Sequence, residues 1–68
     1  MNIFSDFLES QGFILSEGTG NPELFERRGV LAYYTVSEFV FWRKDTNTTL
    51  KISTASPTAC IKAAIEAF

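Results

Sequence analysis

The residues of this chain that could do chemistry are few, and Cys60 is the first to consider. The sequence contains this one cysteine and no histidine. A Ser–His or Cys–His pair for nucleophilic catalysis is therefore impossible, and so is a zinc site built from nitrogen and sulfur ligands. Cys60 stands beside an apolar helical stripe and no base is near it in the sequence. We therefore predict a small buried side chain rather than a reactive thiol.

The acidic residues form no recognisable catalytic pattern. Paired carboxylates can act as general acid and base when the fold brings them together. Asp6 and Glu9 share one face of an expected helix, but this spacing is typical of a solvated surface. The sequence predicts no catalytic residue, no metal site and no cofactor, and we expect that the protein is not an enzyme.

The segment Gly18-Thr19-Gly20 has the composition of a phosphate-binding loop but not its context. A phosphate-binding loop needs a further glycine or a lysine, and a helix directly after it. Here Asn21-Pro22 and an expected strand follow. We therefore interpret residues 17–22 as a loop that joins two strands, and predict no small-molecule substrate.

The composition indicates one small folded domain over residues 1–68. Apolar residues make up 46% of the chain, aromatic residues 15%, and the net charge is −2. Such a chain is too apolar for disorder, and its large aromatic side chains offset its small size. A lone cysteine fits a reducing compartment, so we expect a cytoplasmic protein. No run approaches the roughly 20 apolar residues of a membrane span, and Met1 suggests a complete small open reading frame.

Apolar residues recur with helical spacing at both ends of the chain. Phe4, Phe7 and Leu8 predict a helix over residues 3–11, capped by Asn2 and ended by Gly12. At the other end, the stripe of a second helix consists of Ile61, Ala64, Ile65 and Phe68.

The start and the outer side of this second helix are also marked in the sequence. Ser56 is the expected cap and Pro57 the first helical residue. Lys62 and Glu66 are four residues apart, so they predict an ion pair on the outer side.

The segments between the helices have the β-branched and aromatic composition of strands. We expect strands at 13–16, 23–27, 30–36, 39–44 and 48–53, with a tight turn at 28–29; residues 30–44 could form one bent strand or two. The predicted class is α+β: an N-terminal helix, an antiparallel sheet of three to five short strands, and a C-terminal helix. Both helices are expected on one face of the sheet.

The hairpin around residues 45–47 decides which side chains enter the core. A three-residue loop places Trp42 opposite Leu50. Val40 then also faces the core, opposite Ile52. A two-residue loop changes the pairing by one residue and reverses the face of every side chain. We favour the three-residue loop, whose Asp and Asn tolerate the left-handed conformation found in hairpin turns.

The favoured loop directs Phe39 and Phe41 away from the core, with Arg43 and Lys51 at the rim. Two short helices cannot readily cover both faces of a sheet, so this arrangement predicts an exposed aromatic patch that binds a partner. The alternative is that the helices or the 17–22 loop cover this second face as ordinary core.

The neighbouring pair Tyr33 and Tyr34 leads to the same expectation. Adjacent strand residues point to opposite faces, so one tyrosine belongs to the core and the other lies near solvent. Tyrosine beside arginine is a composition enriched at binding hot spots. The alternative is a tyrosine that shields a sheet edge. The predicted partner-binding residues are Tyr33, Tyr34, Phe39, Phe41, Arg43 and Lys51.

The helix–strands–helix order is similar to the double-stranded-RNA-binding fold and to the HicA-type toxin fold. Residues 7–13, FLESQGF, resemble the helix-Gly-aromatic entry of HicA-like proteins. The chain departs from both families where they carry function. It has Gly20-Asn21 where the toxins have a catalytic histidine, and 55–58 lacks the basic cluster of the RNA binders. The resemblance implies the fold and not the activity.

The leading hypothesis is a small non-catalytic protein-interaction module, either a homodimer or a regulator or inhibitor that docks on a larger protein. Phage and mobile-element accessory proteins often have this character. The alternative is nucleic-acid binding through the sheet, with stacking by Tyr33 or Phe41. Its basic stripe would consist of Arg27, Arg28, Arg43, Lys44 and Lys51. A net charge of −2 places this alternative second.

Overall fold

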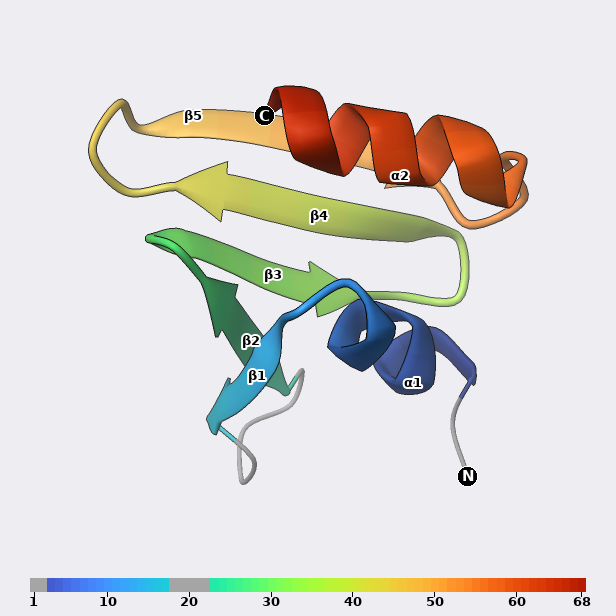
Figure 1. Ribbon diagram of the computed structural model, residues 1–68, viewed down its shortest axis with the longest axis horizontal. Coiled ribbons are helices and arrows are strands. Elements are labelled where there is room, and N and C mark those ends of the chain that lie inside the picture. Colours follow the sequence, from blue (N-terminus) through green and yellow to red (C-terminus); the bar gives the residue numbers. More distant parts are fainter. Residues whose placement is uncertain (1–2, 18–22) are drawn as a thin grey trace.

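The computed structural model describes residues 3–17 and 23–68, and in the chain order one helix precedes an antiparallel sheet and a second helix follows it (Figure 1). The elements are α1 (Ile3–Ser10), β1 (Ile14–Glu17), β2 (Leu24–Arg27), β3 (Val30–Tyr34), β4 (Glu38–Arg43), β5 (Thr48–Ser53) and α2 (Thr58–Ala67). The strand order β1-β2-β3-β4-β5 follows the chain. The predicted α+β class is confirmed, and residues 30–44 form two strands. The predicted cap at Asn2 and the loop at 18–22 lie outside the described residues.

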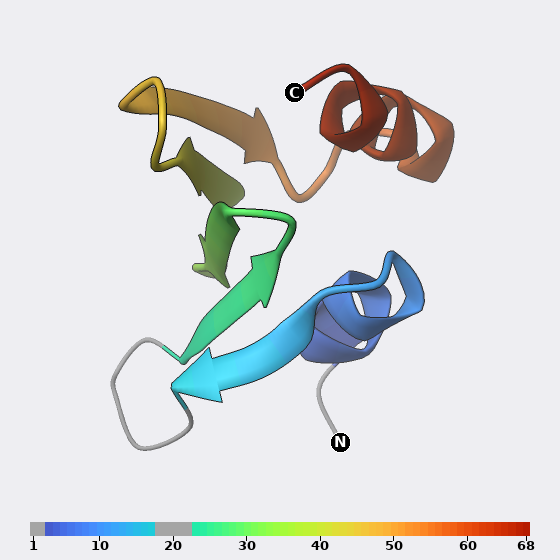
Figure 2. The same ribbon diagram turned by 60° about the vertical axis from the view of Figure 1, so that its left-hand side comes forward.

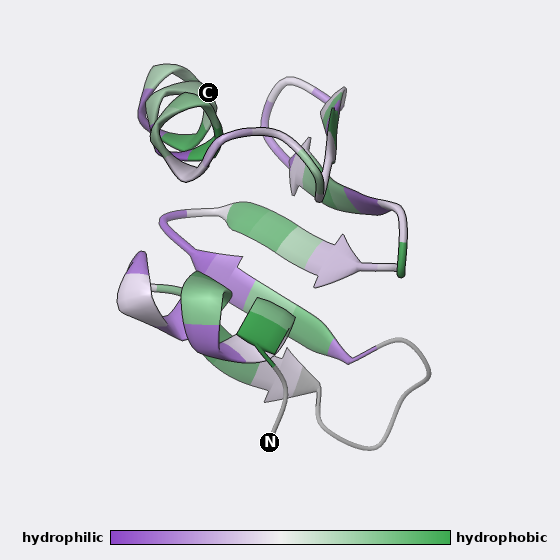
Figure 3. Ribbon diagram, turned by 90° about the vertical axis from the view of Figure 1, so that its right-hand side faces the viewer, coloured by the Kyte–Doolittle hydropathy of each residue, from purple (hydrophilic) through white to green (hydrophobic). Residues whose placement is uncertain are grey.

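Both helices lie on the same side of the sheet, as predicted (Figure 2). Apolar and polar segments alternate along each helix (Figure 3), as expected for helices with one buried face. The main core fills the space between the helices and this side of the sheet. Its buried members are Leu8, Phe13, Phe25, Val30, Ala32, Phe39, Phe41, Ile61 and Ile65.

Helix α1 contacts the sheet through the apolar face that its spacing predicts. Leu8 is fully buried, and the rings of Phe4 and Phe7 lie 5.7 and 5.5 Å from the ring of Phe39. Gly12 has a φ of +90° and its backbone N–H donates to the carbonyl of Glu9. The left-handed conformation at Gly12 ends the helix, as predicted.

Helix α2 buries Ile61 and Ile65 as predicted, but its first turn differs from the prediction. Pro57, with a ψ of 140°, occupies the cap position, and no side chain caps the helix. The predicted cap by Ser56 is therefore wrong, because the extended backbone of Pro57 makes Thr58 the first helical residue.

Two further predictions for α2 are also wrong: the buried position of Cys60 and the ion pair between Lys62 and Glu66. Cys60 is exposed, because each helical residue advances about 100° around the axis, and this rotation turns Cys60 away from the buried Ile61. Glu66 pairs with Arg27 of β2 at 3.3 Å rather than with Lys62.

The β4–β5 hairpin has the register that reverses the favoured prediction. Phe41 pairs with Leu50 and Arg43 pairs with Thr48, so the connection is the four-residue segment 44–47. An even-numbered loop reverses the faces relative to a three-residue loop. The predicted outward orientation of Phe39 and Phe41 is therefore wrong, and these side chains are 2% and 1% exposed.

The β2–β3 hairpin confirms the tight turn at residues 28–29. Arg27 pairs with Val30, and Arg28 and Gly29 have φ values of 51° and 80°. Positive φ at both central residues is typical of the type I′ turn, which matches the twist of the flanking strands. This turn places Phe25 beside Ala32 on the core side of the sheet.

Candidate interaction surface

The side of the sheet away from the helices carries a second group of apolar residues. The register places Leu31 beside Trp42 and Tyr33 beside Val40 on this side, which we call the open face. These side chains surround a shallow hollow of about 290 Å³. The residues that line the hollow are Leu24, Leu31, Tyr33, Val40, Trp42, Thr49 and Lys51.

Val40 at the centre of this group is 5% exposed although it does not belong to the main core cluster. Its neighbours on the same face are Tyr33 across the strand pair and Trp42 two residues along β4. Large side chains in these positions shield a smaller one between them. The open face therefore has a small apolar centre of its own.

The Trp42 side chain is held in one orientation by a hydrogen bond. Its indole Nε1–H donates to Oδ1 of Asn47 over 2.9 Å. Asn47 has a φ of 53°, a left-handed conformation that asparagine tolerates. A tryptophan with its polar atom already bonded and its ring half-buried offers a large apolar surface at a small entropic cost.

Four charged side chains on the open face balance in sign. Glu26 and Glu38 supply two negative charges, and Lys44 and Lys51 supply two positive charges. Nζ of Lys44 lies 3.3 Å from Oε2 of Glu26, and both side chains of this pair are more than a third exposed. An exposed pair of this kind contributes about 0 to 1 kcal/mol, so it can exchange partners.

The structure brings together two of the six residues predicted to bind a partner. Tyr33 is half-buried and Lys51 is exposed, and both line the hollow of the open face. Tyr34 lies on the helix side, where its ring is 5.7 Å from that of Phe4 and its hydroxyl donates to Oε1 of Glu23 over 3.5 Å. Phe39 and Phe41 belong to the core.

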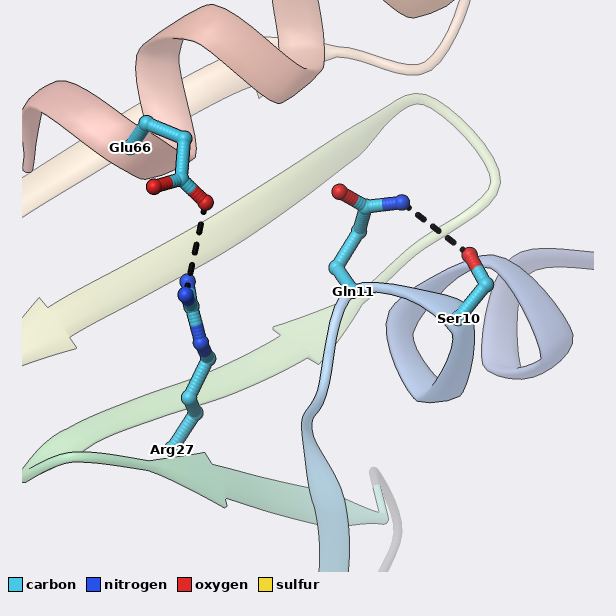
Figure 4. A network of polar contacts seen from close by, with 4 residues as sticks. All are labelled: Ser10, Gln11, Arg27 and Glu66. Carbon is cyan, nitrogen blue, oxygen red and sulfur yellow. Dashed lines mark hydrogen bonds and ion pairs between the residues drawn. The ribbon is translucent and has the colours of Figure 1, made fainter.

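Arg43, the sixth residue, lies on the helix side and contacts the end of α2. Its Nε donates to the carbonyl oxygen of Phe68 over 2.8 Å, and its guanidinium lies 5.5 Å from the centre of the Phe68 ring. Arg27 reaches α2 from β2 through its ion pair with Glu66 (Figure 4). Cations stabilise the C-terminal end of a helix, where carbonyls lack partners. These contacts give both arginines a structural role, because each links a strand to the C-terminal end of α2.

The residues of the proposed basic stripe are consequently divided between the two sides of the sheet. Arg27 and Arg43 belong to the helix side, while Lys44 and Lys51 belong to the open face. Arg28 is exposed in the turn between β2 and β3. A strand of nucleic acid that follows one face would meet only part of this charge.

The sequence prediction missed four apolar residues of the open face: Leu24, Leu31, Val40 and Trp42. A signal for them was present in β5, where Leu50 and Ile52 alternate with Thr49 and Lys51. The pair of phenylalanines in β4 makes the larger core when it faces Leu50 and Ile52, and this choice leaves Val40 and Trp42 outside.

Within residues 3–17 and 23–68, no group of three or more His, Cys, Asp or Glu side chains is placed to hold a metal ion. None of the helices in the same residues is long and apolar enough to span a membrane. Comparison with protein-family models, curated proteins and solved structures found no match. We therefore infer the function from the residues and geometry of this chain.

Proposed function

We propose that this protein is a small non-catalytic protein-interaction module that binds its partner through the open face. The observation that supports this proposal most is the apolar group around Val40 and Trp42, on a side of the sheet that neither helix covers (Figure 2). Apolar groups gathered on a surface and rimmed by charge are characteristic of protein-binding sites.

The residue types of the open face also suit a protein partner. Tryptophan and tyrosine are enriched at interface hot spots, where they fill pockets and lose little rotamer freedom. Trp42 and Tyr33 border the hollow, and Lys51 lies at its rim. The nucleic-acid alternative is less favoured, because Arg27 and Arg43 of its basic stripe lie on the helix side and not on this face.

The experiment compares wild-type protein with Trp42→Glu as immobilised bait. The bait is offered its own isotope-labelled chain and a soluble extract of its source cells, and captured proteins are quantified by mass spectrometry. Trp42→Glu is expected to lose at least one partner that the wild type retains, because a carboxylate on the open face must be desolvated on binding.

The matched control is Ile3→Glu, which also exchanges a large apolar side chain for a carboxylate. Ile3 is 73% exposed and lies on α1, on the opposite side of the sheet. This control is expected to keep the wild-type partners. Identical capture by the wild type and Trp42→Glu, the labelled chain included, would refute the proposed function.

A further inference from the structure

The side chains that β4 presents on the open face have a self-complementary order. Along the strand and into the next residue these side chains are Glu38, Val40, Trp42 and Lys44. The row therefore has an acid at one end, two apolar residues in the middle and a base at the other end. When a second copy of this row is laid against the first in the opposite direction, each acid meets a base and each apolar residue meets an apolar residue.

Two sheets that pack face to face keep their strands within about 30° of each other, about 10 Å apart. A second copy can then lie in one of two directions, depending on how the two-fold axis lies in the interface. An axis along the strands places Glu38 near Glu38 of the second copy. An axis across the strands, between Val40 and Trp42, places Glu38 opposite Lys44 of the second copy. Only the second arrangement avoids like charges.

The same axis also matches the apolar side chains. Trp42 lies opposite Val40 of the second copy, and the register of β3 with β4 places Leu31 opposite Tyr33 of the second copy. The axis repeats each of these contacts, so both halves of the apolar group become covered. This pairing of large with small side chains is the kind that fills a space between two sheets.

The size and charge of the face are appropriate for this partner. The molecule measures 32 × 29 Å across its broad face and 19 Å in depth, and Figure 1 views it along the short direction with the helices toward the reader. A standard interface takes about 800 Å² from each partner, so this dimer would use most of the side that the molecule presents away from its helices. Glu26 and Glu38 balance Lys44 and Lys51, so these four side chains carry no net charge that would repel a second copy.

We propose that the open face binds the open face of a second copy, with the strands reversed and Glu38 opposite Lys44 of the other chain. This inference rests on the proposed function and names its partner. Side chains two residues apart on a strand are about 7 Å apart, so Glu38 and Lys44 lie about 10 Å from the axis. A 30° rotation displaces them by about 5 Å, which these long side chains can span. Lys44 gives up its exposed contact with Glu26 to do so.

The test uses charge exchange between the two ends of the row. Glu38→Lys and Lys44→Glu each create like charges at both ends of the interface, so each is expected to weaken dimerisation about tenfold. The double variant Glu38→Lys with Lys44→Glu restores opposite charges and is expected to recover the wild-type dissociation constant. Sedimentation equilibrium from 1 to 500 µM protein measures all four proteins.

Lys62→Glu is the matched control, because it makes the same charge change on the exposed side of α2. It is expected to leave the dissociation constant unchanged. A wild-type monomer over the whole concentration range would overturn the inference. So would a double variant no tighter than the single ones. Either result leaves the proposed function standing if Trp42→Glu still loses a different protein in the capture experiment, so the two proposals can fail separately.

Discussion

Phe41 and Trp42 are adjacent in the chain, and their side chains lie on opposite sides of the sheet. Phe41 is 1% exposed and its ring lies 5.7 Å from that of Phe13. Trp42 lies on the open face and is half-buried. Two large aromatic side chains of the same strand therefore face different surroundings: the first contributes to the stability of the core, and the second belongs to the surface that we propose binds a partner.

We predict that Phe41→Ala and Trp42→Ala have very different effects on stability. Phe41→Ala leaves a core cavity and is expected to cost about 3 to 5 kcal/mol, which is comparable to the whole stability of a domain of this size. Trp42→Ala is expected to cost about 1 kcal/mol. Circular dichroism during urea unfolding measures both. Equal losses, or a larger loss for Trp42→Ala, would contradict the observed register.

The difference between these two residues also explains where the sequence-based prediction was wrong. Both alternations of β4 are apolar, Phe39 with Phe41 on one face and Val40 with Trp42 on the other. The hydrophobic pattern alone therefore cannot select a face, and the turn residues Asp45–Asn47 are compatible with loops of different length. Tyr33 and Lys51 were found because their faces do not depend on the length of that loop. One of two adjacent tyrosines had to lie outside the core, and Lys51 alternates with the apolar Leu50 and Ile52 of β5.

At the scale of elements, the β2–β3 turn is the part of the fold that depends most on its own two residues. Arg28 and Gly29 both have positive φ, a region that costs little for glycine and about 1 kcal/mol or more for other residues. A Cβ added at Gly29 meets no atom within 4 Å. Any loss of stability on substitution of Gly29 therefore results from the backbone conformation alone.

We expect opposite effects from two substitutions in this turn. Gly29→Ala should destabilise the protein by about 1 kcal/mol, whereas Arg28→Asn should stabilise it by a few tenths of a kcal/mol, because asparagine tolerates the left-handed region. Thermal unfolding followed by circular dichroism measures whether each substitution raises or lowers the stability. Lys62→Ala, at an exposed helical position, is the control and should change stability by less than about 0.5 kcal/mol. A neutral Gly29→Ala would argue against the type I′ geometry.

The elements themselves could be predicted from the sequence because their signals are local. The predicted strand at 48–53 matches β5 residue for residue, and the turn at 28–29 and the helix end at Gly12 are both observed. The pairing of Glu66 could not be predicted from local spacing, because its partner Arg27 lies 39 residues away in the chain. Long-range contacts of this kind depend on the fold as a whole.

At the scale of the whole molecule, the sheet has two apolar sides and helices on only one of them (Figure 2). A domain of this size buries only about 60% of the surface of its unfolded chain. Covering the open face with a second copy would add apolar contact that residues 3–17 and 23–68 of one chain do not provide for this side of the sheet. Folding and association are then linked.

From this linkage we predict that the melting temperature depends on protein concentration. Because a dimer forms only from folded chains, higher concentration stabilises the folded state by mass action. Differential scanning calorimetry is expected to show the midpoint rising by several degrees between 5 and 500 µM. The Trp42→Glu variant is expected to lose this dependence. A concentration-independent midpoint in the wild type would count against the dimer.

Trp42 is the single tryptophan of the chain, and its place beside the hollow of the open face gives the protein an intrinsic optical reporter. Indole emission shifts to shorter wavelength when water leaves the ring, and no other residue emits in the same band. Excitation at the red edge of the indole absorption therefore reads the state of this one face without a label. Any partner that covers the open face should shift the emission maximum of Trp42 to shorter wavelength. A ligand bound on the helix side should leave this emission spectrum unchanged.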